Sequence, residues 1–465
     1  MHSFMKNTQN SEVSRYTHCA QIDKAHIWHP FTPWEVWRCA DPLIIESGQG
    51  VELIDIDGLR YLDGVSSLWC NVHGHSHPSL LETISGQAQK LCHSTMLGLS
   101  HLPVIELTEQ LIRIVPDNLS RVFYADSGTT AVEAALRMSL EWWQKQGGSG
   151  QHKTKLLSLV GAYHGDSLGA VGVGFLESFH KSLTHAVIPA LRVKPPHIYR
   201  FFEGESPEIA LEKSLADLSA TLVDQADTLA AMIVEPLVQG AAGIWVHPDE
   251  YLREAARLCK LHNVLFIADE VATGFGKTGS MFSVEKAGVK PDILVLGKGL
   301  SAGYLPISAA VTTEEIFLAF GGDPQERKTF YYGQTFCGNP LAAAVATENL
   351  KIFARDHVLD LLPGRIEHFA KELEKQISGL AHVDEVRRLG LMTGIDFTQT
   401  PGKRDPHDTS DGIGMRITME ARKRGAIIRP LGDTMVLMPA LAMKEDDLTK
   451  LVEITAQAIE AVLGN

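Results

Sequence analysis

The sequence lacks paired cysteines, long apolar runs and an apolar N-terminal segment. Its six cysteines are scattered and none forms a Cys-x-x-Cys pair, which favours reduced thiols over a disulfide framework or a zinc site. No stretch reaches the roughly 18 consecutive apolar residues of a membrane-spanning helix. Residues 1–21 are polar and carry no signal-peptide centre. We therefore expect a cytoplasmic protein whose first 21 residues form a loosely ordered arm.

A long basic run is also missing, and the formal net charge is -14. This charge argues against nucleic acid or an anionic membrane as the main partner. With 465 residues, of which 45% are hydrophobic and 21% charged, the chain has the composition of a globular protein. Its length predicts two or more domains.

The N-terminal part contains short elements rather than long helices. Pro30 and Pro33 interrupt the aromatic segment 26–37, so it cannot form one long helix. Residues 43–62 alternate short β-like runs with Asp-Gly and Gly turns, which predicts a small antiparallel meander. Farther on, the alternating His73, His75 and His77 could share one face of a strand and bind a metal. However, Gly74 and Pro78 favour a polar loop, and we predict no metal site there.

From about residue 103 the pattern alternates between helices and strands, which predicts an α/β fold with a mainly parallel sheet. After about residue 341 it changes to long helices and short strands, which predicts a separate α+β lobe. The expected strands of the sheet cover 122–124, 156–160, 231–234, 264–268 and 293–296. The expected helices include 103–114, 130–143, 248–261, 341–353, 364–380 and 444–463, and the expected strands of the lobe cover 383–388, 392–397, 426–429 and 434–438.

Four features at the ends of these strands carry chemical interest. Lys298 follows a buried strand between Gly297 and Gly299, where burial would lower its pKa and make its amine a nucleophile. Asp269 ends another apolar strand, the place where ligands bind in parallel sheets. Tyr163 follows a third strand and could offer a flat face to a ring. Each residue alone also fits an ordinary solvated or packed side chain.

The fourth feature is a strand-to-helix junction at residues 125–133. Thr130 and Glu133 have the spacing of a capping box, and Ser127 and Thr129 add hydroxyl groups near free backbone N–H groups. Such a junction binds anions, although a capped helix without a ligand is equally compatible with the local pattern. Two apparent phosphate motifs are dismissed because the glycine spacing fails at 271–278 and at 169–174.

Together, an anion site, a flat ring, a strand-end acid and a nucleophilic amine are what pyridoxal 5′-phosphate (PLP) requires of a protein. The sequence resembles the class III aminotransferases of PLP fold type I over nearly its whole length. The resemblance is carried, in order, by DSGTTAVEAALR, GAYHGDSLGA, IADEVATGFGKTG, LGKGLSAGYLP and GQTFCGNPLAAA. It implies an α/β fold with a large, mainly parallel sheet domain at 76–345. It also implies a smaller α+β domain built from both termini, from residues 1–75 and 346–465.

The resemblance also implies roles for individual residues. Lys298 would bind PLP covalently and move a proton, Asp269 would pair with the pyridine nitrogen, and Trp69 would complete the catalytic set. The other expected cofactor contacts are Ser127, Gly128, Thr129, Tyr163, Val271, Gly333, Gln334 and Thr335, the last reaching the phosphate of a neighbouring subunit in a homodimer. The expected substrate contacts are Phe31, Leu68, Trp69, Tyr163, Asp166, Lys298, Gly333 and Arg429, with Arg429 as the carboxylate clamp.

Within the class, HIWHPFT, SSLWCNVHGHSHP and IIRPLGD are similar to the branch that transaminates 8-amino-7-oxononanoate in biotin biosynthesis. The amino donor would be S-adenosylmethionine or L-lysine. Several positions depart from the pattern of the adenosylmethionine users, and some of these resemble the lysine-using branch; the departures are Phe31, Leu68, Lys277, Gln334 and Val436. The alternatives are a broader ω-amino acid:pyruvate aminotransferase and a PLP-fold module that acts by binding alone.

Overall fold

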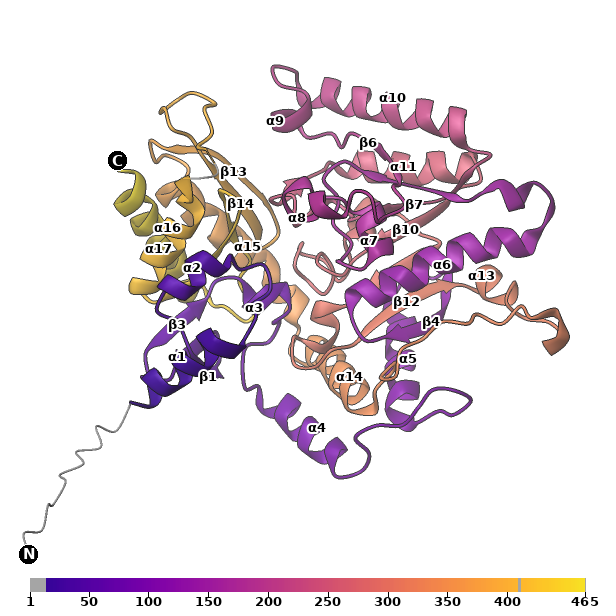
Figure 1. The fold of residues 1–465 in the computed structure, drawn as a ribbon, viewed down its shortest axis with the longest axis horizontal. Coiled ribbons are helices and arrows are strands. Elements are labelled where there is room, and N and C mark those ends of the chain that lie inside the picture. Colours follow the sequence, from indigo (N-terminus) through magenta and orange to yellow (C-terminus); the bar gives the residue numbers. More distant parts are fainter. Residues whose placement is uncertain (1–13, 409–410, 465) are drawn as a thin grey trace, which may run out of the picture.

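The computed structural model describes residues 14–408 and 411–464, and its largest unit is a seven-stranded sheet (Figure 1). The strand order is β4-β12-β11-β10-β7-β5-β6. Strand β12 runs antiparallel to both β4 and β11, and the remaining pairs are parallel. The strands are β4 (Leu119–Ala125), β5 (Lys155–Leu159), β6 (Leu191–Val193), β7 (Leu229–Val234), β10 (Leu265–Asp269), β11 (Ile293–Leu296) and β12 (Ser308–Thr313).

Both faces of this sheet are covered. Along β7, Ala231 and Ile233 pack into the core beneath helix α6 (Gly128–Gln146), whereas Met232 and Val234 pack into the core on the opposite face. Since successive side chains of a strand point to opposite faces, burial on both sides requires apolar residues at every position. This explains why the central strands are continuous apolar runs.

Most other helices of this part of the chain lie around the sheet, and α4 projects away from it and contacts α14 (Figure 1). They include α5 and α14 near β4 and β12, and α10 and α11 near β6 and β10. Their bounds are α4 (Pro78–Ala88), α5 (Leu102–Ile114), α7 (Leu168–Val173), α8 (Glu177–His180), α9 (Ile198–Phe201), α10 (Pro207–Gln225), α11 (Asp249–Leu261), α12 (Ser283–Ala287), α13 (Glu314–Leu318) and α14 (Pro340–Arg355).

Both ends of the chain meet in the second, smaller part of the molecule (Figure 1). The N-terminal meander β1-β2-β3 is extended by β15, which pairs with β3 in parallel, and a second sheet has the order β13-β14-β17-β16. The strands are β1 (Ile45–Gln49), β2 (Glu52–Asp55), β3 (Arg60–Asp63), β13 (Val383–Leu389), β14 (Met392–Phe397), β15 (Ala426–Ile427), β16 (Arg429–Leu431) and β17 (Thr434–Leu437). The helices are α1 (Arg15–His26), α2 (Trp34–Cys39), α3 (Ser66–Trp69), α15 (Val358–Gln376), α16 (Ile413–Lys423) and α17 (Glu445–Leu463).

The fold confirms the predicted α/β class, the meander and the lobe, and it corrects two details. The prediction of a loose arm over residues 1–21 is wrong for its described part, because Arg15–His26 is a helix whose N-cap, Ser14, accepts a hydrogen bond from the Thr17 N–H; residues 1–13 lie outside the described part. The elements missed by the prediction include strands β6 and β12 and helices α4, α10 and α16. A strand such as β12, antiparallel in an otherwise parallel sheet, has no local signature that reveals its direction.

Candidate active site

A cavity of about 150 Å³ lies beyond the carboxyl ends of β5, β7, β10 and β11. Parallel strands bring their carboxyl ends to the same edge of a sheet, so residues from distant segments meet there. The predicted residues in its lining are Trp69, Gly128, Thr129, Tyr163, Asp269, Val271 and Lys298. His164, Gly165, Glu235 and Ala272 also line it and were not predicted.

Lys298 lies at the floor of the cavity, directly after Gly297 at the end of β11. Its backbone has a φ of 41°, in the left-handed region that is costly for a residue with a side chain. Burial lowers the pKa of Lys298, and the nearby carboxylates of Asp269 and Glu235 oppose this shift. The ammonium nitrogen lies 5.0 Å from the centre of the Trp69 ring. The chain therefore holds a desolvated amine in one constrained position.

Asp269, the last residue of β10, has both carboxylate oxygens in hydrogen bonds. His164 Nδ1 donates to Oδ2 over 2.7 Å, and the Val271 N–H donates to Oδ1 over 3.0 Å. His164 is buried, and its Nε2 has no partner in the described part of the structure. These two bonds fix the orientation of the carboxylate. A buried carboxylate held in this way is suited to pair with a cation in the cavity.

Helix α6 begins at the cavity with a cap that differs from the predicted one. Ser127 is the N-cap: its Oγ accepts a bond from the Thr130 N–H, and Thr130 Oγ1 accepts a bond from the Ser127 N–H. The predicted Thr130–Glu133 capping box is wrong, because the Glu133 carboxylate instead accepts bonds from Ser167 Oγ and the Ala170 N–H. The cap starts three residues earlier than the pattern suggested, which brings Gly128 to the first turn of the helix.

Gly128 and Gly165 allow the residues around the first turn of α6 to pack closely together. A Cβ on Gly128 would lie 2.6 Å from a methyl group of Val271, and one on Gly165 would lie 2.2 Å from Thr129 Oγ1. Neither position can accept a larger side chain without movement of its neighbours. Backbone N–H groups at the positive end of a 19-residue helix are thus exposed to the cavity, which forms an anion site.

Tyr163 forms part of the opposite wall. Its N–H donates to Glu235 Oε2 over 3.1 Å, and its hydroxyl donates to Asp166 Oδ2 over 2.6 Å. Burial, followed by the bond to Asp166, raises the pKa of Tyr163, so the phenol stays neutral. Asp166 also pairs with His180, whose ring stacks at 12° to the Tyr163 ring. Asp166 itself is exposed beside the cavity.

Trp69 enters the cavity from a strained turn. Ser66 and Trp69 have φ angles of 51° and 65°, and the Trp69 Nε1 is buried without a partner in the described part of the structure. Asp63 supports the turn, because its carboxylate accepts bonds from the N–H and the hydroxyl of Ser67. The turn therefore places an aromatic face close to Lys298.

A buried lysine, Lys277, forms hydrogen bonds to the same turn. The Lys277 ammonium donates to Ser66 Oγ over 2.8 Å and to the carbonyl oxygens of Asn71 and Pro439, each over 3.2 Å. Its acceptors are neutral, and burial lowers its pKa to about 8. Lys277 thus joins the turn segment after β10 to the N-terminal segment and the C-terminal lobe.

Other predicted residues lie outside the lining of this cavity. Phe31 is 55% exposed and its ring meets the Phe179 ring edge-on at 5.4 Å. Leu68 is half exposed beside Trp69. Arg429 begins strand β16, opposite the buried Val436.

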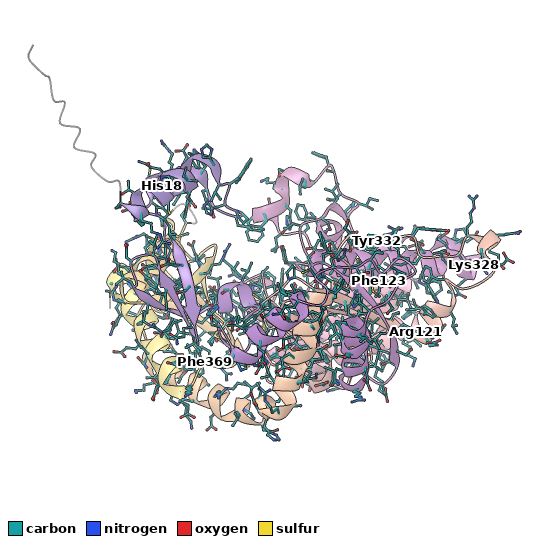
Figure 2. All side chains as sticks on the ribbon, turned by 90° about the horizontal axis from the view of Figure 1, so that it is seen from below. His18, Arg121, Phe123, Lys328, Tyr332 and Phe369 are labelled. Atoms are coloured by element: carbon teal, nitrogen blue, oxygen red, sulfur yellow. The ribbon has the colours of Figure 1, made fainter. Side chains whose placement is uncertain are left out.

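The segment with Gly333, Gln334 and Thr335 lies at the edge of the large sheet. The neighbouring Tyr332 stacks on Phe123 of β4 at 6.0 Å, and Figure 2 shows this pair in the half of the molecule opposite to His18 of α1. Gly333 and Thr335 are exposed there. Within one chain these residues do not line the cavity.

In the 73–77 segment, the rings of His73 and His77 lie 6.0 Å apart, and His75 has other partners. His73 bonds with Asn349, and His75 pairs with Asp63. Among residues 14–408 and 411–464, no group of three His, Cys, Asp or Glu side chains is placed to hold a metal ion. The histidines serve to pack and connect the loop.

The family model of the class-III aminotransferases matches residues 36–459. The chain belongs to the class III aminotransferases. It is similar to adenosylmethionine-8-amino-7-oxononanoate aminotransferase of Nitratidesulfovibrio vulgaris, with 44% identity over 97% of this chain and 83% of that protein. The corresponding protein of Aquifex aeolicus is 41% identical over 94% and 96% of the two chains.

Solved structures agree with this family. The adenosylmethionine-8-amino-7-oxononanoate aminotransferase of Methanocaldococcus jannaschii superposes with a TM-score of 0.90 at 37% identity, over 96% of this chain and 99% of that chain. The ω-transaminase of Pseudomonas jessenii in complex with PMP has a TM-score of 0.90 at 30% identity, over 95% and 98%.

Class III aminotransferases are PLP-dependent, and PLP is the cofactor of this chain. The residues of the cavity fit it. Asp269 provides a buried carboxylate for a ring nitrogen, the start of α6 provides free N–H groups for a phosphate, and Lys298 provides an amine. Val271 is held directly against Gly128, where a Cβ would lie 2.6 Å from its methyl group.

Proposed function

We propose that this enzyme transfers an amino group to 8-amino-7-oxononanoate, forming 7,8-diaminononanoate in biotin biosynthesis. The observation that carries the proposal is the meeting of Lys298, Asp269 and the α6 N-terminus in one buried cavity. This geometry supports PLP-dependent amino transfer, and the relatives at 44% and 41% identity support the substrate.

Lys298 is the proposed covalent anchor and proton carrier. Bound PLP supplies an electron sink for the substrate carbon whose proton is removed. Because burial lowers its pKa, the released Lys298 amine is available as a base and moves the proton at that carbon. The left-handed backbone at Lys298 and the Trp69 ring limit the positions that this amine can take.

The remaining cofactor contacts follow from the walls of the cavity. Asp269, oriented by His164, would hold the ring nitrogen in its protonated form. Tyr163 and Val271 would cover the two faces of the ring. The N–H groups of Gly128 and Thr129, with the Ser127 cap, would bind the phosphate.

We assign the substrate contacts to the outer part of the site. Trp69 contributes its ring, which lines the cavity beside Lys298, and Asp166 offers a carboxylate beside the cavity. Phe31 and Leu68 add apolar surface, and the planar guanidinium of Arg429 suits a substrate carboxylate.

A homodimer would complete each site, with Gly333, Gln334 and Thr335 reaching the phosphate held by the partner subunit. The exposure of Gly333 and Thr335 supports this proposal. Several large apolar side chains near this segment are also exposed, including Leu97 at 86% and Phe336 at 55%, as expected for an interface. We further propose a large domain at 76–345, a small domain at 1–75 and 346–465, and a cytoplasmic location. No described helix combines the length and hydropathy needed to cross a membrane.

The decisive experiment incubates the purified enzyme and PLP with 8-amino-7-oxononanoate and one donor at a time. S-adenosylmethionine and L-lysine test the two branches of the family, and an ω-amino acid with pyruvate as acceptor tests the broader activity of the ω-transaminases that share the fold. Formation of 7,8-diaminononanoate with either of the first two donors supports the proposal. If the enzyme transfers an amino group only from the ω-amino acid to pyruvate, the broader ω-transaminase activity would replace the proposed function.

A further inference from the structure

Glu235 is a second buried carboxylate in the active-site cavity. It follows β7 directly, is 5% exposed and belongs to the cavity lining. Strands β7 and β10 are hydrogen-bonded neighbours in which Val234 pairs with Ala268, so the next residues along the two strands, Glu235 and Asp269, lie side by side. Carboxylates at the ends of adjacent parallel strands lie close together at the same sheet edge.

The hydrogen bonds of Glu235 connect two walls of the site. Oε2 accepts the N–H of Tyr163 over 3.1 Å, and Oε1 accepts the N–H of Gly240 over 2.8 Å. Gly240 lies against the Trp69 ring, because a Cβ there would be 2.9 Å from it. Both donors are neutral backbone groups, so no cationic side chain among the described residues is bonded to Glu235.

Four titratable groups surround Glu235, and they come from three other strand ends. Tyr163 and His164 follow β5, Asp269 ends β10, and Lys298 follows β11. Burial raises the pKa of Glu235 to about 7; Asp269 adds to the shift, and His164 and the two backbone bonds oppose it. Glu235 in turn raises the pKa of Lys298. Two like charges in a dry site are costly unless two cations balance them.

We propose that Glu235 is a positioning residue that supplies the second negative charge of the cofactor site. Asp269 balances the protonated ring nitrogen, and Glu235 balances the proton on the nitrogen of Lys298 when this nitrogen is bonded to PLP. The carboxylate also ties the backbone of Tyr163 to Gly240 and so sets the distance between the Tyr163 and Trp69 walls. The inference rests on the roles proposed above for Lys298 and Asp269.

The test measures the pKa of the lysine–cofactor linkage from the absorbance of the bound cofactor as a function of pH. In Glu235→Gln, loss of the negative charge disfavours the protonated linkage, so this pKa falls by at least about 0.5 unit. Glu235→Asp keeps the negative charge. In this variant the pKa of the lysine–cofactor linkage should therefore stay closer to the wild-type value than to the value in Glu235→Gln. This measurement needs no catalytic turnover.

Glu270→Gln is the matched control. Glu270 is also fully buried, and burial raises its pKa to about 7 as well. It bonds to Thr273 and to the Val284 N–H and does not line the cavity. Its variant should leave the linkage pKa within about 0.2 unit of the wild type.

An unchanged linkage pKa in Glu235→Gln would overturn the inference, as would an equal shift in Glu270→Gln. A wild-type protein that stays colourless with PLP would instead overturn the cofactor roles proposed for Lys298 and Asp269. If the protein binds PLP and becomes coloured but forms no 7,8-diaminononanoate with either donor, only the proposed substrate would be overturned. The three failures are therefore distinguishable.

Discussion

Replacing Lys277 by Met should remove a pH dependence from the stability of the folded protein. Lys277 is 1% exposed and donates to three neutral oxygens, those of Ser66, Asn71 and Pro439. Burial lowers its pKa from 10.5 to about 8. The unfolded chain therefore binds this proton more tightly than the folded protein does.

The sign and size follow from linkage. Because the folded pKa lies below the unfolded one, the cost of burying the charge is fully present below pH 8 and disappears as the pH rises to 10.5. This difference between the unfolded and folded pKa of Lys277 lowers the free energy of unfolding by about 3 kcal/mol at neutral pH. Between about pH 7.5 and 9.5, the free energy of unfolding should rise by about 2 kcal/mol through this one group.

The assay is reversible urea unfolding of the wild type, Lys277→Met and Lys277→Arg at both pH values. Other groups titrate alike in all three proteins, so the wild type should gain about 2 kcal/mol relative to either variant. Lys277→Arg keeps a donor that remains charged throughout this range and separates lost hydrogen bonds from lost titration. Parallel pH dependence in the wild type and both variants would refute the reasoning.

Four further outcomes test the site. Lys298→Ala should abolish the absorbance of the covalently bound cofactor and lower amino transfer at least about 1000-fold; a wild-type spectrum would mean that another lysine binds PLP. Asp269→Asn should lower kcat about 100-fold or more with the fold intact by circular dichroism, and a change below about threefold would contradict its proposed role. Gly128→Ala places a methyl group against Val271 and should weaken PLP binding by about 1–3 kcal/mol in a fluorescence titration, whereas unchanged affinity would mean that the wall yields. Mixed dimers of Lys298→Ala and Thr335→Ala chains should regain up to about a quarter of wild-type activity, because one of the two sites in each hybrid is intact; no recovery would argue against a shared site.

The main elements of the fold could be predicted because their patterns are local. The central strands are apolar at every position since both faces are covered, as β7 shows with Leu229–Val234 buried throughout. The long helices such as Pro340–Arg355 have apolar periodicity and, in this case, Asn339 as the N-cap. The direction of β12 and the pairing of β15 with β3 could not be predicted, because periodicity reports which face is buried and not which strand lies alongside.

Part of the candidate site could be predicted for a similar reason. Lys298 and Asp269 both follow apolar strands, and parallel strands bring such positions to one edge. Glu235 has the same signal, because it directly follows the apolar strand β7. His164 had no distinguishing pattern, since only the folded chain brings its ring within 2.7 Å of Asp269.

By itself, the sequence determined the class of the fold and the strand ends at which the reactive amine and acid stand. Apolar runs and turn residues specify these features over short distances. Only the tertiary structure decided that Ser127 rather than Thr130 caps α6, that Lys277 supports the Trp69 turn, and that Glu235 shares the cavity with Lys298. These arrangements depend on contacts between segments far apart in the chain, where burial and hydrogen-bond geometry select one partner among many of the same residue type.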